Sequence, residues 1–303
     1  MNGRRARRWH RENATEHATA HRTLFTGPPL GPRAPPRPAL DRRLSGALPA
    51  ATTVERPAPG VRVHQPARGF RYAMDPILLA GFVAEAGPPG RFLEVGTGCG
   101  VAALLLGRLG WQGVGMDVQE GVLDLARRGA LDSGLADQLA FVAGDVRSFA
   151  AAAPPGAPPY PWVLCNPPYW RAGTGPLPAD PAVAAARFAL HGDLDELIPA
   201  MCRLGERVAL VLPLARAREA CVALRAAGRP IARRLDLLPR LCLIEGARSA
   251  APEGPRLEAP LRESGRHSAR VRALYDAVNA ILPDAPPAAG QPSHAAPDPG
   301  GAP

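Results

Sequence analysis

The chain has 303 residues, of which 46% are hydrophobic, enough for one large domain or two small ones. All 36 basic residues are Arg, and most of the net charge of +9 falls on residues 1–60, which hold 11 Arg and four acidic residues. The remainder is nearly balanced, so the total charge does not mark the folded part as nucleic-acid-binding. The chain lacks both a secretory segment and the roughly 18 apolar residues that cross a bilayer. We expect a soluble, cytoplasmic protein without a membrane partner.

The five cysteines are scattered and form no C-x-x-C pair: Cys99, Cys165, Cys202, Cys221 and Cys242. This spacing argues against a zinc site and against a disulfide framework. We therefore expect free thiols and no bound metal.

Residues 1–60 combine Arg clusters with proline-dense segments and have no helix or strand period, so we predict a disordered extension. Three explanations for it stay open: translation from an upstream start codon, a basic arm that contacts RNA phosphates, and an organellar transit peptide. Residues 283–303 are expected to form a second disordered tail. One domain, residues 61–282, remains between them.

Strand and helix patterns alternate through this domain. Strands are predicted at Arg91–Val95, Gly113–Asp117, Leu139–Val142, Trp162–Cys165, Arg207–Leu212, Ile231–Leu237 and Leu241–Glu245. Helices are predicted at Ile77–Glu85, Val101–Leu109, Glu120–Asp132, Val146–Ala150, Ala182–Leu190, Leu194–Leu204, Ala215–Ala227 and Ser268–Leu282. The pattern indicates an α/β fold with a mostly parallel, seven-stranded sheet and helices on both faces. The short connection 238–240 predicts that the last two strands form an antiparallel edge hairpin.

A glycine-rich loop lies where the first of these strands meets its helix, with Gly96, Gly98 and Gly100 at alternate positions. Such glycines let the backbone turn tightly and approach a ligand closely. The G-x-G-x-G spacing differs from the G-x-G-x-x-G of dinucleotide sites. Glu94, two residues before the loop, suits a cationic ligand such as the amino group of a methionine moiety. A turn without a ligand is the alternative.

Acidic residues end the next two strands. Asp117 stands where dinucleotide-binding folds place a carboxylate that binds the ribose hydroxyls. Asp145 would flank an adenine ring, with Val146 contributing its amide, or would cap the following helix. The carboxyl ends of parallel strands meet at one edge of a sheet, so one crevice is expected to collect these residues.

The fourth strand ends in Asn166, Pro167, Pro168 and Tyr169. The prolines have no backbone N–H, and each pushes the residue before it into an extended conformation. The loop therefore offers mainly acceptors, the Asn166 side-chain oxygen and the Pro167 carbonyl, beside an aromatic face. This arrangement suits a flat group that carries a hydrogen-donating amine.

In order along the chain, the acid-plus-glycine loop, Asp117, Asp145 and the Asn-Pro-Pro-Tyr loop resemble the motifs of class I S-adenosylmethionine-dependent amino-methyltransferases. Residues 65–75, 170–175, 186–197, 243–248 and 265–275 are more specifically similar to the bacterial tRNA(Val) adenine-N6 methyltransferase family. Two features depart from that family: no Lys accompanies Arg248, and the first 60 residues have no counterpart.

This resemblance implies a Rossmann-like fold, S-adenosyl-L-methionine as cofactor and tRNA as partner, with methylation of the adenosine 3′ of the anticodon. Asn166, Pro167 and Tyr169 would be the catalytic residues, and Glu94, the three glycines, Asp117, Asp145 and Val146 would bind the cofactor. Substrate contacts are expected from Pro168, Trp170, Arg187 and Arg71.

Other functions remain open. Release-factor glutamine methyltransferases use the same loop on a side-chain amide, but place a helical domain before the catalytic one. DNA adenine methyltransferases usually carry an added recognition domain, for which residues 61–303 leave little room. A non-catalytic S-adenosylmethionine- or RNA-binding protein would not need an intact proline loop.

Overall fold

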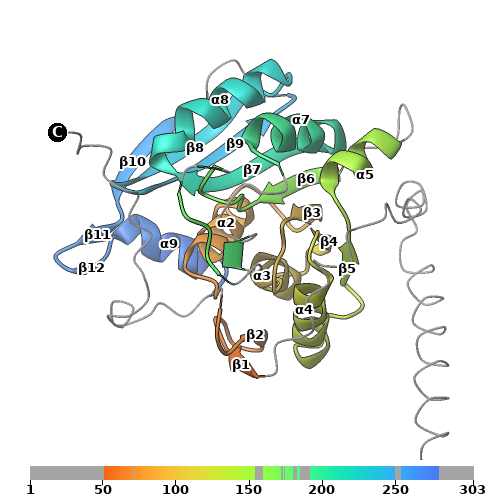
Figure 1. Ribbon diagram of the computed structural model, residues 1–303. Coiled ribbons are helices and arrows are strands. Elements are labelled where there is room, and N and C mark those ends of the chain that lie inside the picture. The colour runs from red at the N-terminus through yellow and green to blue at the C-terminus, as the bar shows by residue number, and fades with distance from the viewer. Residues whose placement is uncertain are drawn as a thin grey trace, which may run out of the picture.

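An eight-stranded sheet runs through the molecule with helices packed against both faces (Figure 1). The structure is a computed structural model that describes residues 51–69, 71–153, 160–171, 173, 175–179, 183–184, 192–249 and 254–279. The predictions for residues 1–50 and 283–303, for Arg187 and for most of the helix at 182–190 lie outside these residues.

Seven strands form at or within a few residues of their predicted positions. They are β3 (Arg91–Val95), β4 (Gln112–Asp117), β5 (Leu139–Ala143), β6 (Tyr160–Cys165), β7 (Gly205–Pro213), β8 (Ile231–Leu238) and β9 (Leu241–Ala247). The eighth, β10 (Arg256–Pro260), was not predicted. The strand order is β10-β8-β9-β7-β6-β3-β4-β5. Only β9 runs opposite to its neighbours β7 and β8.

The extra strand β10 corrects the prediction of a seven-stranded sheet that ends in a hairpin. It pairs in parallel with β8 and covers the outer edge of the β8–β9 hairpin. Its side chains are largely exposed, so the sequence there lacks the alternation of a half-buried strand. Main-chain pairing holds it, together with the buried carboxylate of Asp236, which accepts hydrogen bonds from Arg234 and Arg256.

The helices divide into two layers because neighbouring residues in a strand point to opposite faces of the sheet. Phe92 packs with α2 (Asp75–Ala84), α3 (Val101–Arg108), α4 (Glu120–Asp132) and α9 (Ala269–Ala277). Leu93, on the other face, packs with α5 (Val146–Ala152), α7 (Leu194–Leu204) and α8 (Ala217–Ala226). A short 3-10 turn, η2 (Leu214–Arg216), joins β7 to α8.

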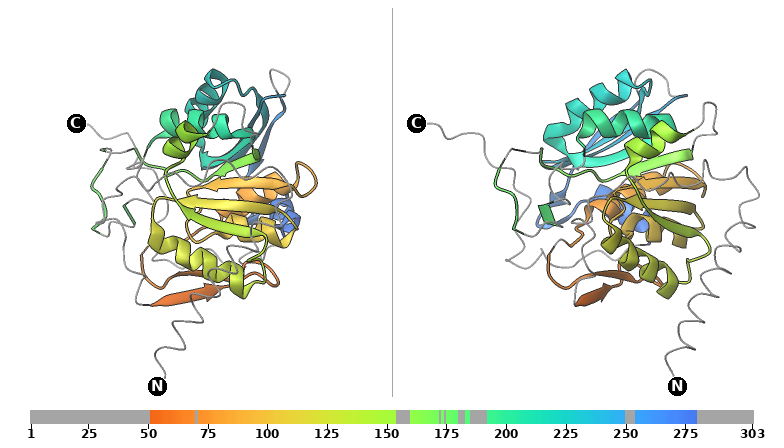
Figure 2. Two further views of the ribbon diagram at one scale, coloured as in Figure 1. Left: turned by 90° about the vertical axis from the view of Figure 1, so that its right-hand side faces the viewer. Right: turned by 45° about the vertical axis from the view of Figure 1, so that its right-hand side comes forward.

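A hairpin outside the main sheet corrects the predicted domain start. β1 (Thr52–Glu55) pairs antiparallel with β2 (Val63–Pro66), so ordered structure begins before residue 61. The hairpin packs against α4, and both views of Figure 2 show it at the opposite end of the molecule from α8. His64 holds it there through a 2.8 Å hydrogen bond between its Nε2 atom and Asp132.

A second small hairpin, β11 (Arg262–Glu263) and β12 (Arg266–His267), follows β10 and leads into α9. No helix in the part of the chain that the structure describes is long and apolar enough to cross a membrane.

Candidate active site

The glycine-rich loop joins the end of β3 to the start of α3. Gly96, Gly98 and Gly100 all have positive φ, at 68°, 54° and 81°, which disfavours other residues. The Met116 carbonyl on β4 accepts hydrogen bonds from the backbone N–H groups of Gly96 and Thr97. A Cβ atom added at Gly96 or Gly98 would meet nothing within 4 Å. The backbone of the loop is therefore anchored on one side and has free space on the other.

The carboxylate of Glu94 holds this loop in place through two hydrogen bonds. Its Oε2 atom accepts hydrogen bonds from the Thr97 hydroxyl at 2.8 Å and from the Ala103 backbone N–H at 3.0 Å. The side chain is only 3% exposed. Burial is the largest effect on the carboxyl and raises its pKa to about 7, although both hydrogen bonds act in the opposite direction. These two hydrogen bonds show that Glu94 joins the glycine loop to α3. Its contact with a cationic ligand stays a prediction.

Asp117, at the end of β4, connects the loop to the neighbouring strand. One carboxylate oxygen accepts from the Gly98 N–H and the other from the Gln119 N–H, both at 2.9 Å. Ribose binding by Asp117 stays a prediction.

Asp145 caps a helix, one of the two roles left open for it. Its side chain accepts from the Arg147 backbone N–H at 2.8 Å, as an N-cap residue does. The Arg147 guanidinium also pairs with this carboxylate at 2.7 Å and with Glu196 at 2.8 Å. The Val146 side chain is buried in the core on the α5–α7 side of the sheet. A contact of either residue with an adenine ring stays a prediction.

The proline loop follows β6, which pairs directly with β3. The Oδ1 atom of Asn166 is buried and accepts no hydrogen bond from any residue that the structure describes. The Tyr169 hydroxyl donates to Asp75 at 2.7 Å, and burial with this carboxylate raises its pKa well above 10. The loop therefore holds an unsatisfied acceptor beside an aromatic ring that stays neutral.

Four charged side chains tie the proline loop to the elements beside it. Arg216, in η2, donates to Asp193 and Glu219 and reaches the Pro168 carbonyl at 3.5 Å. Arg171 pairs with the same two carboxylates at 3.3 and 2.9 Å. The two arginines lower the pKa values of both acids against the opposing effect of burial. This ion-pair cluster fixes the carboxyl end of the loop to α7 and α8.

No protein-family model matches the chain. It is 31% identical over 192 residues to a tRNA1(Val) (adenine(37)-N6)-methyltransferase of Tolumonas auensis, covering 60% of this chain and 73% of the relative. It is also 35% identical over 137 residues to a release factor glutamine methyltransferase of Rhodospirillum rubrum, but spans only 40% of that relative and 44% of its own length. The chain belongs to the S-adenosylmethionine-dependent methyltransferases. Among solved structures, a methyltransferase from Agrobacterium tumefaciens matches 65% of the chain at 15% identity, with a TM-score of 0.49.

The methyltransferase brings most of its predicted site residues to one edge of the sheet. Glu94, the three glycines and Asp117 form a single hydrogen-bonded unit, and the proline loop ends the strand next to it. Trp170 follows the loop in a half-buried position. Arg71, predicted to contact substrate, instead donates to Thr53 and Glu55 on β1.

Two residues in contact with the proline loop of the methyltransferase were not predicted as site residues. Asp75 lies in the segment 65–75 that resembles the tRNA methyltransferases, but no role was assigned to it. Arg216 lies between a strand and a helix with no motif around it. Their partners, Tyr169 and Pro168, are 94 and 48 residues away in the sequence, so no local pattern reveals them.

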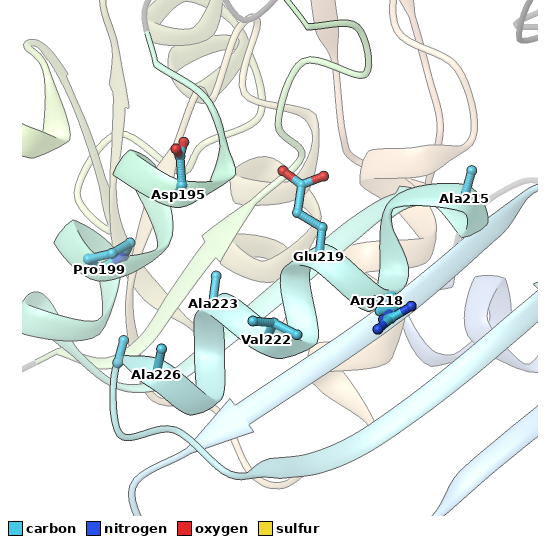
Figure 3. A pocket seen from close by; sticks show the side chains of 9 residues that line it. Asp195, Pro199, Ala215, Arg218, Glu219, Val222, Ala223 and Ala226 are labelled. Atoms are coloured by element: carbon cyan, nitrogen blue, oxygen red, sulfur yellow. The ribbon is translucent and has the colours of Figure 1, made fainter.

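A shallow groove between α7 and α8 lies on the outer surface of the methyltransferase. Its lining is mostly apolar, and Asp195 and Glu219 lie along one side (Figure 3). It shares Glu219 with the ion-pair cluster but none of the glycine-loop residues. Within the described ranges, no group of three or more His, Cys, Asp or Glu side chains is arranged to hold a metal ion.

Proposed function

We propose that this methyltransferase transfers a methyl group to the exocyclic N6 amine of an adenosine in tRNA, next to the anticodon. The observation that carries the proposal is the buried, unsatisfied Oδ1 atom of Asn166 at the end of β6. A buried acceptor without a donor costs about 1 to 3 kcal/mol, and an amine hydrogen would satisfy it. The 31% identical tRNA1(Val) (adenine(37)-N6)-methyltransferase supports adenine as the bearer of that amine.

The residues at the β3 and β4 ends fit S-adenosyl-L-methionine. The space above Gly96 and Gly98 admits a ligand close to the backbone, and the Asp117 carboxylate, which binds the Gly98 N–H, lies beside that space. When bound, this cofactor supplies a methyl group on a positively charged sulfur. Glu94, the glycine loop and Asp117 would hold it, and Asp145 with Val146 would border its adenine.

At the proline loop, the chain positions the nucleophile. The Asn166 side-chain oxygen accepts one hydrogen of the amine and the Pro167 carbonyl accepts the other. These two acceptors favour a pyramidal nitrogen whose lone pair points toward the methyl group instead of into the ring. The Tyr169 ring, held by Asp75, supports the face of a base that has been flipped out of its stack.

Alignment and preorganised dipoles account for the acceleration in this scheme. The amine proton becomes acidic once the nitrogen is methylated and leaves to water, so a strong general base is not required. A tRNA substrate would place the protein in the cytoplasm.

A second candidate is methylation of a glutamine side-chain amide in a release factor. The 35% identical glutamine methyltransferase favours it, and an amide NH2 presents the same two hydrogens to the loop. The described residues before β3 form a small hairpin and one helix, α2. They do not form the helical recognition domain expected of the glutamine enzymes.

Incubation of the purified protein and labelled cofactor with total tRNA, release factors and DNA in separate reactions tests the proposal. We expect label in adenosine of the tRNA pool, whereas label only in the release factors would contradict it. Asn166→Ala should lose most of the transfer and still bind S-adenosylhomocysteine with wild-type affinity. Near-wild-type transfer by this variant would contradict the role of the amide.

A further inference from the structure

The carboxyl edge of the sheet continues beyond the proline loop to the turn after β8 and the hairpin after β10. Because β9 is antiparallel to both β7 and β8, β8 runs in the same direction as β6 and β7. β10 is parallel to β8, so it ends at the same edge. The N–H of Leu214, the residue after β7, donates to the Arg240 carbonyl at 2.7 Å and fixes the turn beside η2. Figure 1 shows the β11–β12 hairpin projecting at this side of the sheet.

A chain of contacts links the β11–β12 hairpin to the proline loop. The His267 ring on β12 stacks on Tyr275 of α9, with 6.1 Å between the ring centroids. Tyr275 lies in α9, which packs against α2, the helix that begins at Asp75. Asp75 in turn accepts the hydrogen bond from Tyr169. The hairpin therefore adjoins the side of the site where the substrate base is proposed to lie.

Four exposed arginines lie on these adjoining segments, and we name them the basic corner: Arg240 in the turn after β8, Arg262 and Arg266 on the hairpin, and Arg272 in α9. The Leu261 N–H donates to the Leu238 carbonyl and joins the start of the hairpin to the end of β8. None of the four has a carboxylate partner among the described residues. Arg262 and Arg272 donate only to the main-chain carbonyls of Gly265 and His267.

The arginines elsewhere in the sheet contrast with this group. Carboxylates pair with Arg207, Arg233, Arg234 and Arg256 on the strands. The β11–β12 hairpin contains one acidic residue, Glu263 on β11. Its single negative charge does not balance the four positive guanidinium groups of the basic corner. The corner therefore carries a positive charge that the described part of the chain does not neutralise.

The buried His267 beneath the corner does not add to this charge. It is 8% exposed, and neither ring nitrogen has a hydrogen-bond partner in the described structure. Burial, followed by the charges of Arg262 and Arg272, lowers its pKa, so the ring is neutral near pH 7. The charge of the corner belongs to guanidinium groups, which stay protonated at any physiological pH.

We propose that the basic corner binds backbone phosphates of the RNA substrate on the 3′ or 5′ side of the methylated nucleotide. This inference rests on the proposed function. Guanidinium groups bind phosphate oxygens bidentately, and phosphate contacts set the position of a nucleic acid without reading its sequence. A release factor offers no such row of anions, so the corner distinguishes an RNA substrate from a protein one.

The test compares Arg240→Gln/Arg266→Gln with the wild-type protein in binding unmodified tRNA at several KCl concentrations. We expect the affinity to fall about tenfold or more at low salt, and the slope of log Kd against log salt to decrease by about two, one for each lost phosphate contact. The affinity for S-adenosylhomocysteine should not change.

The matched control is Arg56→Gln/Arg203→Gln, which removes two exposed arginines outside the basic corner, Arg56 directly after β1 and Arg203 near the end of α7. An equal loss of tRNA affinity in both double variants would reduce the effect to total charge and overturn the proposal. Wild-type tRNA affinity in the corner variant would also overturn it while leaving the proposed function intact. If the wild-type protein methylates only release factors, the proposed function itself fails.

Discussion

The Tyr169 hydroxyl donates to the Oδ2 atom of Asp75 over 2.7 Å and ties the aromatic residue of the proline loop to the first turn of α2. Tyr169→Phe keeps the ring and removes this hydrogen bond. We expect the methyl-transfer rate to fall about tenfold, because a ring that is free to shift no longer fixes the base. Loss of a donor to the buried Asp75 carboxylate should also lower the free energy of unfolding by about 1 to 3 kcal/mol.

Single-turnover rates and urea denaturation measure these two effects. Tyr160→Phe is the matched control, since Tyr160 begins the same strand, β6, at the opposite edge of the sheet. If Tyr169→Phe and Tyr160→Phe have equal transfer rates, the hydroxyl of Tyr169 has no part in positioning.

Gly98→Ala tests whether the free space above the glycine loop is a ligand site. A Cβ atom there meets no protein atom within 4 Å, but φ is +54°, so the substitution costs about 1 to 2 kcal/mol of backbone strain. Gly134→Ala has the same properties, with φ at +69° and no atom within 4 Å, and lies just after α4. Both variants should lose similar stability, while only Gly98→Ala should bind S-adenosylhomocysteine about tenfold more weakly by calorimetry. Equal affinities in the two variants would show that no ligand approaches Gly98.

The buried Glu94 carboxyl should make stability depend on pH. Its pKa is about 7 in the folded protein and near 4.5 when unfolded, so the folded state binds more protons between these values. The free energy of unfolding should therefore fall as the pH rises from about 4.5 to 7, by on the order of 1 to 3 kcal/mol. The Glu94→Gln variant has no carboxyl group at this position, so its free energy of unfolding should not show this fall with pH. Denaturation of both proteins at pH 5 and pH 8 measures it, and parallel stability curves would contradict the raised pKa.

Arg216 should act on catalysis through the position of the proline loop. Arg216→Lys keeps the positive charge. A single ammonium group cannot donate to Asp193, Glu219 and the Pro168 carbonyl at the same time, as the Arg216 guanidinium does. We expect kcat to fall 10- to 100-fold with the KM for the cofactor unchanged. Arg218→Lys, an exposed change two residues away, should retain activity. A rise in the cofactor KM of Arg216→Lys without a fall in kcat would contradict a positioning role.

The sequence predicted the regular part of the fold because periodicity and local signals agreed there. β3, α4 and α7 have the bounds that were expected. Asp193 caps α7, and Gly205 at its end coincides with the start of β7. The meeting of the β3, β4 and β6 loops at the carboxyl edge followed from parallel strand order alone.

Elements stabilised by distant partners were missed. β10 depends on β8 and on Asp236, and β1 depends on its pairing with β2, so neither segment carries its own pattern of buried residues. The contact of Arg71 with Glu55 was also missed, because residues 1–60 were predicted to be a disordered extension. The role of Asp145 as a helix cap was open because the same residue type serves caps and ligand sites.

The strand order divides the carboxyl edge into two regions that meet between β3 and β6, where Asn166 follows β6. Loops after β3, β4 and β5 form the side proposed for the cofactor, and those after β7, β8 and β10 extend the side proposed for the substrate. The loops on the second side come from residues after 165 in the chain, and Asp75 of α2 supports them through Tyr169. A chimaera that exchanges this carboxyl-terminal portion between relatives should thus redirect the choice of substrate while preserving the affinity for the methyl donor, and the family could diversify its targets by the same modular route.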